Sequence, residues 1–268
     1  MTGQRYALPV LNTVGLILML TLNGLANALP INGVTTGGVS DRYNNLFTPA
    51  GLTFSIWGII YLLLTAFVVY QWMAARKGTD DFTSRVSIWF FVSCLANAGW
   101  ILAWHYRLLP LSLMLMLVLL GCLLAVYLRL GIGMRQVARG ERMLVHLPFS
   151  VYLGWITVAT IANVAVLLTS IQWGAWGLSA QFWTVTVIAV ATAISLAMAF
   201  RRGDVYFCLV VVWALVGIVL KRLSDSTVPD QAIVAAAIAA LALVSAASVV
   251  QAVRRRVYRA AIVQYDTD

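Results

Sequence analysis

Long uncharged apolar segments, separated by clusters of Lys and Arg, constrain this chain more than any other feature. A helix rises about 1.5 Å per residue, so about 20 apolar residues cross a hydrocarbon core of about 30 Å. Charge clusters and prolines divide the sequence into eight such candidates. They are residues 7–28, 52–72, 86–104, 109–128, 144–168, 182–200, 205–220 and 231–250. We therefore predict an all-α integral membrane protein with about eight transmembrane helices.

Composition agrees with a membrane protein. The chain is 62% hydrophobic and only 10% charged, a balance that a soluble domain could not bury in its core. The net charge of +9 does not indicate a nucleic-acid partner, because the basic residues are spread over short connections between helices. We expect the lipid bilayer to be a partner and nucleic acid not to be one.

Basic residues alternate between the two predicted faces of the membrane. An eight-helix topology puts 14 Lys and Arg residues on the side of both termini and 4 on the other side. Cytoplasmic loops carry such an excess. The sequence thus predicts cytoplasmic N- and C-termini, an inner or plasma membrane, and an outer position for the long polar loop 30–48. The first segment imitates a secretory signal, and we expect it to be retained as a helix.

Acidic, histidine and cysteine residues give no sign of a catalytic or metal site. All nine Asp and Glu residues fall in predicted loops or tails, which argues against a proton-coupled pump. The histidines, His105 and His146, lie near predicted helix ends. Each is expected to be an interfacial anchor, with ligation of a porphyrin metal as an alternative for His105. We predict no metal site, no catalytic triad and no obligatory cofactor.

Aromatic and amide side chains share helix faces in three segments. Such faces are formed by Trp57 with Tyr61, by Asn97 with Trp100 and Trp104, and by Trp155 with Ala159 and Asn163. An unpaired amide in hydrocarbon is costly, so both asparagines need a partner in a ligand or another helix. Two interpretations stay open: a binding site, or amides that join helices and tryptophans that pack.

These residues stand in an order that resembles the tryptophan-rich sensory protein, or translocator protein, family (TspO/MBR). The family's second-helix pattern W-x-x-x-Y is matched by Trp57 and Tyr61 after Pro49, and its third-helix pattern by Asn97 and Trp100. The fifth-helix pattern is matched by these residues: Tyr152, Leu153, Trp155, Ala159 and Asn163. The sequence departs from the family's residues at Leu52, Ala96, Val151 and Val158.

The resemblance covers five helices and implies a division of the chain. It implies a TspO-like five-helix bundle over residues 1–170 with a lid at 30–48. Beyond it lie three additional helices over 171–252, which make this an enlarged member, and a basic cytoplasmic tail over 253–268.

The resemblance also implies a pocket for porphyrins and aromatic molecules. Trp57, Tyr61, Trp100 and Trp155 would be its apolar walls, and Asn97 would donate a hydrogen bond. Ala159 and Asn163 would complete the fifth-helix face, while Tyr43 and Pro49 would belong to the lid.

The implied function is a membrane receptor or sensor that binds a hydrophobic aromatic small molecule, a porphyrin or haem-type tetrapyrrole. Alternatives are a transporter of such a molecule and a light-dependent porphyrin-degrading enzyme, for which Trp57 and Trp155 are the catalytic candidates. We lean against enzymatic turnover. A homodimer is also left open.

Overall fold

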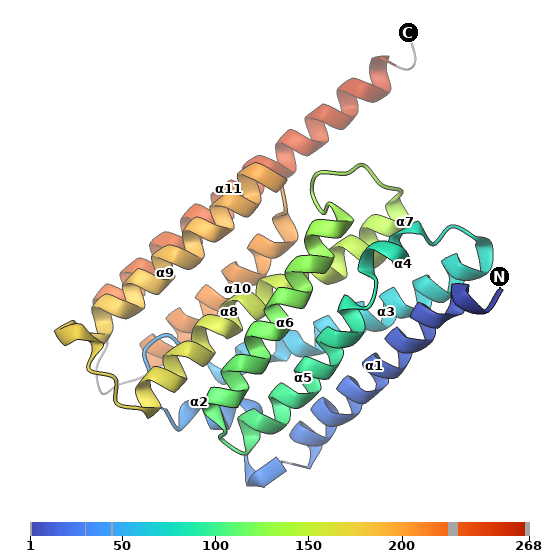
Figure 1. Cartoon of the computed structure of the whole chain (residues 1–268). Coiled ribbons are helices and arrows are strands. Elements are labelled where there is room, and N and C mark those ends of the chain that lie inside the picture. Colours follow the sequence, from blue (N-terminus) through green and yellow to red (C-terminus); the bar gives the residue numbers. More distant parts are fainter. Residues whose placement is uncertain (1, 30, 44, 225–229, 266–268) are drawn as a thin grey trace.

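A computed structural model describes residues 2–29, 31–43, 45–224 and 230–265, and within these ranges it contains helices and no strands (Figure 1). The long helices are α1 Thr2–Ala28, α3 Ile56–Lys77, α5 Trp89–His105, α6 Leu109–Leu130, α8 Leu147–Ser170, α9 Ala180–Ala197, α10 Val205–Ser224 and α11 Gln231–Tyr265. The shorter helices and turns are η1 Ile31–Gly33, α2 Thr36–Asp41, η2 Gly51–Ser55, α4 Asp81–Val86, α7 Arg139–Glu141, η3 Arg142–His146, η4 Ala175–Gly177 and η5 Met198–Arg202. The all-α prediction is confirmed.

Among the described residues, seven helices are long and apolar enough to cross a membrane. The predicted third crossing is the exception, because α5 has only 17 residues, a length of about 26 Å. The chain breaks before it at Ser87, whose φ of 52° lies in the left-handed region. Nevertheless α5 packs between α1 and α6 as a full member of the bundle. The predicted count of about eight is therefore approximate.

Other predicted boundaries differ by a few residues. Helix α10, expected to be short, has 20 residues and ends at Ser224. Helices α3 and α6 are followed by Gly78 and Gly131, with φ of 77° and 64°. Glycine adopts this left-handed conformation at little cost and so terminates helices well.

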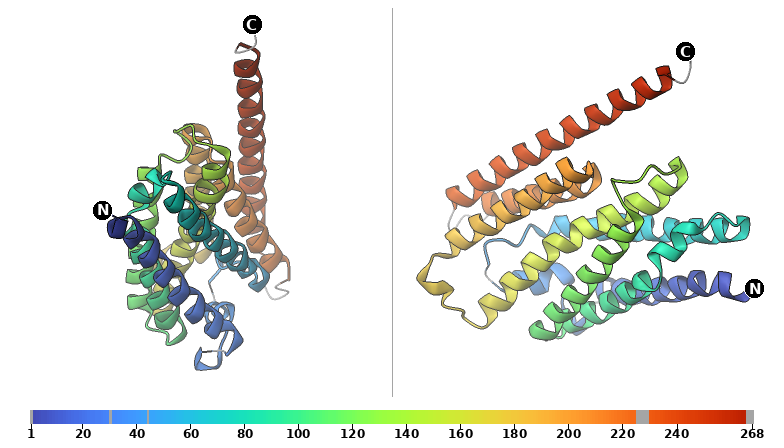
Figure 2. Two further views of the ribbon diagram at one scale, coloured as in Figure 1. Left: turned by 90° about the vertical axis from the view of Figure 1, so that its right-hand side faces the viewer. Right: turned by 45° about the horizontal axis from the view of Figure 1, so that its top comes forward.

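Helices α9, α10 and α11 form a group on one side of the other helices (Figures 1 and 2). Within this group α10 is the innermost, packing against α8 as well as α11. Its residues Phe207, Val211 and Leu215 belong to the same apolar core as Trp57 and Trp155. The division of the chain near residue 170 stays a prediction, and α10 shares a core with the helices before it.

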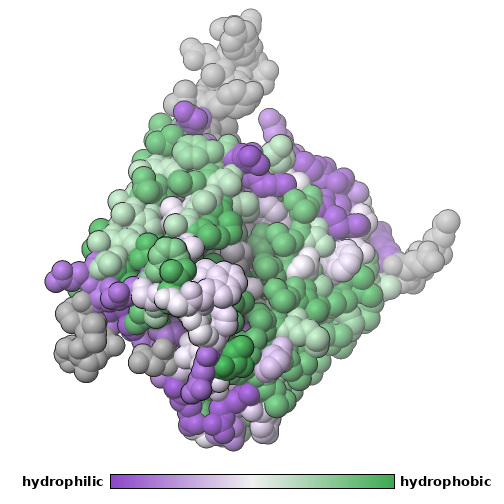
Figure 3. Space-filling view, turned by 60° about the vertical axis from the view of Figure 1, so that its left-hand side comes forward, coloured by the Kyte–Doolittle hydropathy of each residue, from purple (hydrophilic) through white to green (hydrophobic). Residues whose placement is uncertain are grey.

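The molecular surface has the pattern of a membrane protein. An apolar band separates two polar rims on the face seen in Figure 3. Large exposed apolar side chains include Ile17, Leu62 and Val249. Both termini lie at the same end of the bundle (Figure 1). Which side of the membrane this end faces stays a prediction.

One carboxylate is more buried than the sequence suggests. Asp204 lies in the connection between η5 and α10, as expected for a loop acid, yet it is only 3% exposed. Its oxygens accept hydrogen bonds from the Tyr127 hydroxyl (2.8 Å), the Ser150 hydroxyl (2.8 Å) and the Phe207 backbone N–H (3.2 Å). Asp204 therefore joins α10 to α6 and α8.

Candidate functional site

Trp57, at the start of α3, is the centre of an aromatic cluster. Its ring centroid lies 6.0 Å from Trp100 on α5 and 6.2 Å from Trp155 on α8. It also stacks on Tyr61 at 5.5 Å and meets Tyr152 edge-on at 6.1 Å. The helix faces inferred from residue spacing thus bring the four expected aromatic rings together.

One side of this cluster encloses a small cavity. Its volume is about 30 Å³, room for about two water molecules. Trp57, Trp100 and Trp155 line it, as do the predicted residues Pro49, Ala159 and Asn163. Phe54, Trp104 and Ser40 add to the lining. As it stands, this cavity is much too small for a drug-sized ligand, for which pockets are about 300–1,000 Å³.

The other side of Trp57 faces a ligand-sized cleft. This cleft, of about 660 Å³, lies between α1, α2 and the segment from η2 to the first turns of α3. Trp57 and Tyr61 line it, together with polar groups of Asn27 and Thr35 and with Asp41. A Cβ atom added at Gly24, Gly51 or Gly58 would meet nothing within 4 Å, so these three glycines of its lining leave open space.

Two indole N–H groups at the cavity have no acceptor in the described part of the chain. Nε1 of Trp100 and Nε1 of Trp155 are both buried and find no hydrogen-bond partner among the described residues. A buried donor without a partner is costly, and a ligand or a water molecule would satisfy it. The tryptophans expected to be purely apolar walls therefore also offer hydrogen-bond donors.

Asn97 lies elsewhere, in a network between helices. Its Oδ1 accepts from Nδ2 of Asn23 (2.8 Å), and its Nδ2 donates to the Tyr152 hydroxyl (3.0 Å), linking α5 to α1 and α8. Asn97 lines neither the cavity nor the cleft described above. The amide of Asn97 thus joins helices, and its hydrogen bond to a ligand stays a prediction.

Asn163 joins two helices and also lies at the cavity. Its Nδ2 donates to the Ser112 hydroxyl on α6 at 3.0 Å, which joins two helices. Its side chain also lines the aromatic cavity.

No group of three or more His, Cys, Asp or Glu residues in the described part of the chain could hold a metal ion.

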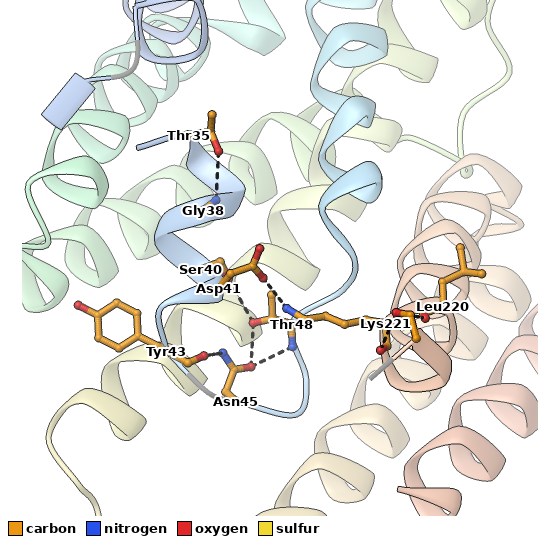
Figure 4. Close-up of polar contacts among 10 residues, drawn as sticks. Thr35, Gly38, Ser40, Asp41, Tyr43, Asn45, Thr48, Leu220 and Lys221 are labelled. Carbon is orange, nitrogen blue, oxygen red and sulfur yellow. Dashed lines mark hydrogen bonds and ion pairs between the residues drawn. The ribbon is translucent and has the colours of Figure 1, made fainter. Parts of the chain in front are cut away.

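The described part of the loop over 30–48 lies over the cluster and includes η1 and α2. Trp104 donates its indole N–H to the Thr36 carbonyl at 3.0 Å. Pro49 follows the loop and lies in the cavity lining. Tyr43 lines neither hollow, and Figure 4 shows its ring pointing away from Asp41 and Lys221.

His105 holds this loop against the end of α5 through two hydrogen bonds. It is only 1% exposed, which corrects the expectation of an interfacial anchor. Its Nδ1 lies 3.1 Å from the Ile31 carbonyl and its Nε2 lies 3.2 Å from the Thr36 hydroxyl. A carbonyl only accepts, so Nδ1 carries the proton and Nε2 accepts from Thr36. Both ring nitrogens are occupied, and neither is left to ligate a porphyrin metal.

A His105→Phe variant tests this attachment. We expect amide hydrogen exchange in α2 to become about 5- to 30-fold faster, because losing two buried hydrogen bonds costs about 1–2 kcal/mol locally. Exchange in the part of α11 that packs against α9 and α10 is the internal control. Unchanged protection of α2 would contradict the attachment.

Sequence reasoning missed several residues around the site. Phe54 contacts Trp155 edge-on at 5.9 Å and lines both hollows. Asn23 completes the buried amide network, and it could have been found as an amide within the apolar first segment. Thr36 showed no signal, since its partners are about 70 positions away in the chain.

These features define a class: an all-helical integral membrane protein with an aromatic cavity and an adjoining cleft beneath a folded loop. The family described as TSPO-like protein matches residues 9–250, so the chain belongs to this family. The match continues through α9, α10 and most of α11, and is not confined to the first five helices of the resemblance. No curated protein and no solved structure matches the chain significantly. Family membership supports a membrane sensor or binder of hydrophobic ligands in general.

Proposed function

We propose that this protein is a membrane receptor or sensor for a flat aromatic molecule, a tetrapyrrole of the porphyrin or haem type, and that the ligand lies against Trp57. One observation carries the proposal. Trp57, like Phe54, lines both the aromatic cavity and the cleft. It can therefore contact a ligand in the cleft while Trp100 and Trp155 pack against it.

Because the two hollows differ in size, they would hold different parts of the ligand. The cleft, at about 660 Å³, has the size of pockets that bind cofactors and drugs, about 300–1,000 Å³. A tetrapyrrole would lie over the stacked Trp57–Tyr61 pair. Each good aromatic contact would add about 0.5–1.5 kcal/mol beyond area burial. The small cavity would take only a substituent or water.

The chemistry of the lining suits an amphipathic ligand. Trp57, Tyr61 and Phe54 offer apolar rings, whereas Asn27 and Thr35 lie at the same cleft with polar groups. Rings on one side and polar groups on the other would orient a molecule that has an apolar face and polar substituents. We further propose that both termini face the cytoplasm, in line with the distribution of basic residues.

Titration of the purified protein with protoporphyrin IX tests the proposal. We expect saturable binding, seen as a shift of the Soret band, and an affinity about tenfold lower for Trp57→Ala, equivalent to about 1.4 kcal/mol. The matched control is Trp89→Ala, because Trp89 is 39% exposed on α5 and lines neither hollow.

Three outcomes would count against the proposal. A wild-type protein that shows no saturable binding is not a porphyrin receptor. Equal affinities of the wild type and Trp57→Ala would place the ligand away from the cluster. A loss shared equally by Trp57→Ala and Trp89→Ala would point to non-specific damage and would also remove the support for Trp57.

A further inference from the structure

Helix α10 contacts the chain segment that follows the loop, although the two segments lie far apart in the sequence. The Ala50 backbone N–H donates to the Gly217 carbonyl at 3.0 Å. The Trp213 indole N–H donates to the Thr53 carbonyl at 2.9 Å. Two positions one helical turn apart on α10 thus fix the backbone where the loop passes into η2.

Gly217 allows this close approach. A Cβ atom at this position would collide with the Thr53 hydroxyl oxygen and would lie only 2.9 Å from Cβ of Pro49. Only glycine lets the backbone of α10 lie directly against the Pro49–Thr53 turn. The contact therefore requires glycine at position 217 and leaves no room for a larger side chain.

An ion pair extends the same contact to the loop itself. Lys221, one turn beyond Gly217, places its Nζ 2.6 Å from Oδ1 of Asp41 at the end of α2. Figure 4 shows the two side chains pointing toward one another across the gap between α10 and the loop. Asp41 is itself part of the cleft lining, so this pair connects α10 directly to the proposed binding site.

The loop is fastened within itself at the same place. The Ser40 hydroxyl donates to the Thr48 hydroxyl at 3.2 Å. The Thr48 backbone N–H and hydroxyl both donate to Oδ1 of Asn45, at 2.9 and 2.8 Å (Figure 4). These bonds hold the end of α2 to the chain before Pro49. The described residues of this part of the loop should therefore move together with Asp41.

We propose that α10 positions the loop over the cleft. Trp213 and Gly217 are positioning residues that hold the chain where the loop ends. Lys221 forms an ion pair with Asp41, which we call the latch, and this pair holds α2 over the cleft. The proposal rests on the proposed function in one respect, that a ligand occupies this cleft. Breaking the latch would let α2 move away from the cleft and would speed both entry and release of ligand.

The expected size of the effect is modest, because the pair is partly exposed, with side chains 24% and 54% accessible. Pairs of this kind contribute about 0.2–1 kcal/mol, a factor of about 1.4 to 5. They are also screened by salt, with a Debye length of about 10 Å at 0.1 M and about 3 Å at 1 M. The effect should thus be larger at low ionic strength.

The test uses the full-length protein with Lys221→Met and Asp41→Asn. In the ligand-free protein we expect amide hydrogen exchange in α2 to be about two- to fivefold faster at low salt in either variant. Protoporphyrin IX release should accelerate by a similar factor. The reversed pair, Asp41→Lys with Lys221→Asp, should restore the slow rates. The control is Asp81→Asn, which breaks the 2.9 Å pair with Arg85 on α4, away from the loop.

The outcomes separate the latch from the proposed function. Unchanged exchange of α2 in Lys221→Met would overturn the latch, whatever happens to binding. Faster exchange of α2 in Asp81→Asn as well would also overturn it, since the effect would not be specific. If the wild type does not bind protoporphyrin IX, the proposed function fails, while hydrogen exchange still decides the latch.

Discussion

A Gly58→Leu variant should bind protoporphyrin IX about tenfold more weakly than the wild type, and Gly24→Leu with Gly58→Leu about 100-fold more weakly. Both glycines line the cleft, from α1 and α3, and a Cβ atom at either would meet open space. Leucine side chains would occupy the volume that the ligand needs. Forcing a larger side chain into a filled site costs about 1–3 kcal/mol per substitution, and tenfold corresponds to about 1.4 kcal/mol.

The design separates a blocked cleft from a misfolded protein. Glycine is a poor helix former, so leucine at these helical positions should raise helix stability by about 0.8 kcal/mol per site. Gly121→Leu is the matched control, because Gly121 on α6 also has open space around its Cβ position and lines neither hollow. Full affinity in the double variant, measured by the same titration, would show that the cleft is not the binding site.

Local spacing was enough to predict which residues share a helix face. Trp57 with Tyr61, and Trp155 with Ala159, are spaced by one helical turn, so each pair must share a face wherever a helix forms. An uncharged run forms the helix, but spacing does not say whether the aromatic face meets other helices or the lipid. That the three faces meet was implied by the family resemblance alone.

Partner choice could not be predicted in the same way. Asn97 and the tryptophan N–H groups are all polar groups in apolar helices, and spacing does not say which of them finds a protein partner. Asn97 does so because Asn23 and Tyr152 happen to face it from two other helices. Lys221 and Asp41 are 180 positions apart, and no local pattern connects them. Long-range geometry decides such pairs.

The largest loss of stability should follow Asp204→Ala. The variant leaves the Tyr127 and Ser150 hydroxyls and the Phe207 N–H without their acceptor in a buried place. Each unsatisfied buried group costs about 1–3 kcal/mol, so we expect the free energy of unfolding to fall by about 3–5 kcal/mol. Unfolding in mixed detergent micelles, followed by circular dichroism, measures it.

Variants that remove one hydrogen bond each measure how much each partner of Asp204 contributes to the free energy of unfolding. Tyr127→Phe and Ser150→Ala each remove one hydrogen bond to a carboxylate and should cost about 1.5–3 kcal/mol. Tyr127 also carries the Arg202 guanidinium over its ring, 5.1 Å from the centroid, a contact that Tyr127→Phe largely keeps. Asp81→Ala is the control, because Asp81 is exposed and its pair with Arg85 lies within one short helix. If Asp204→Ala unfolds with the same free energy as Asp81→Ala, the carboxylate does not join α10 to α6 and α8, and the shared apolar core alone would hold the C-terminal helices in place.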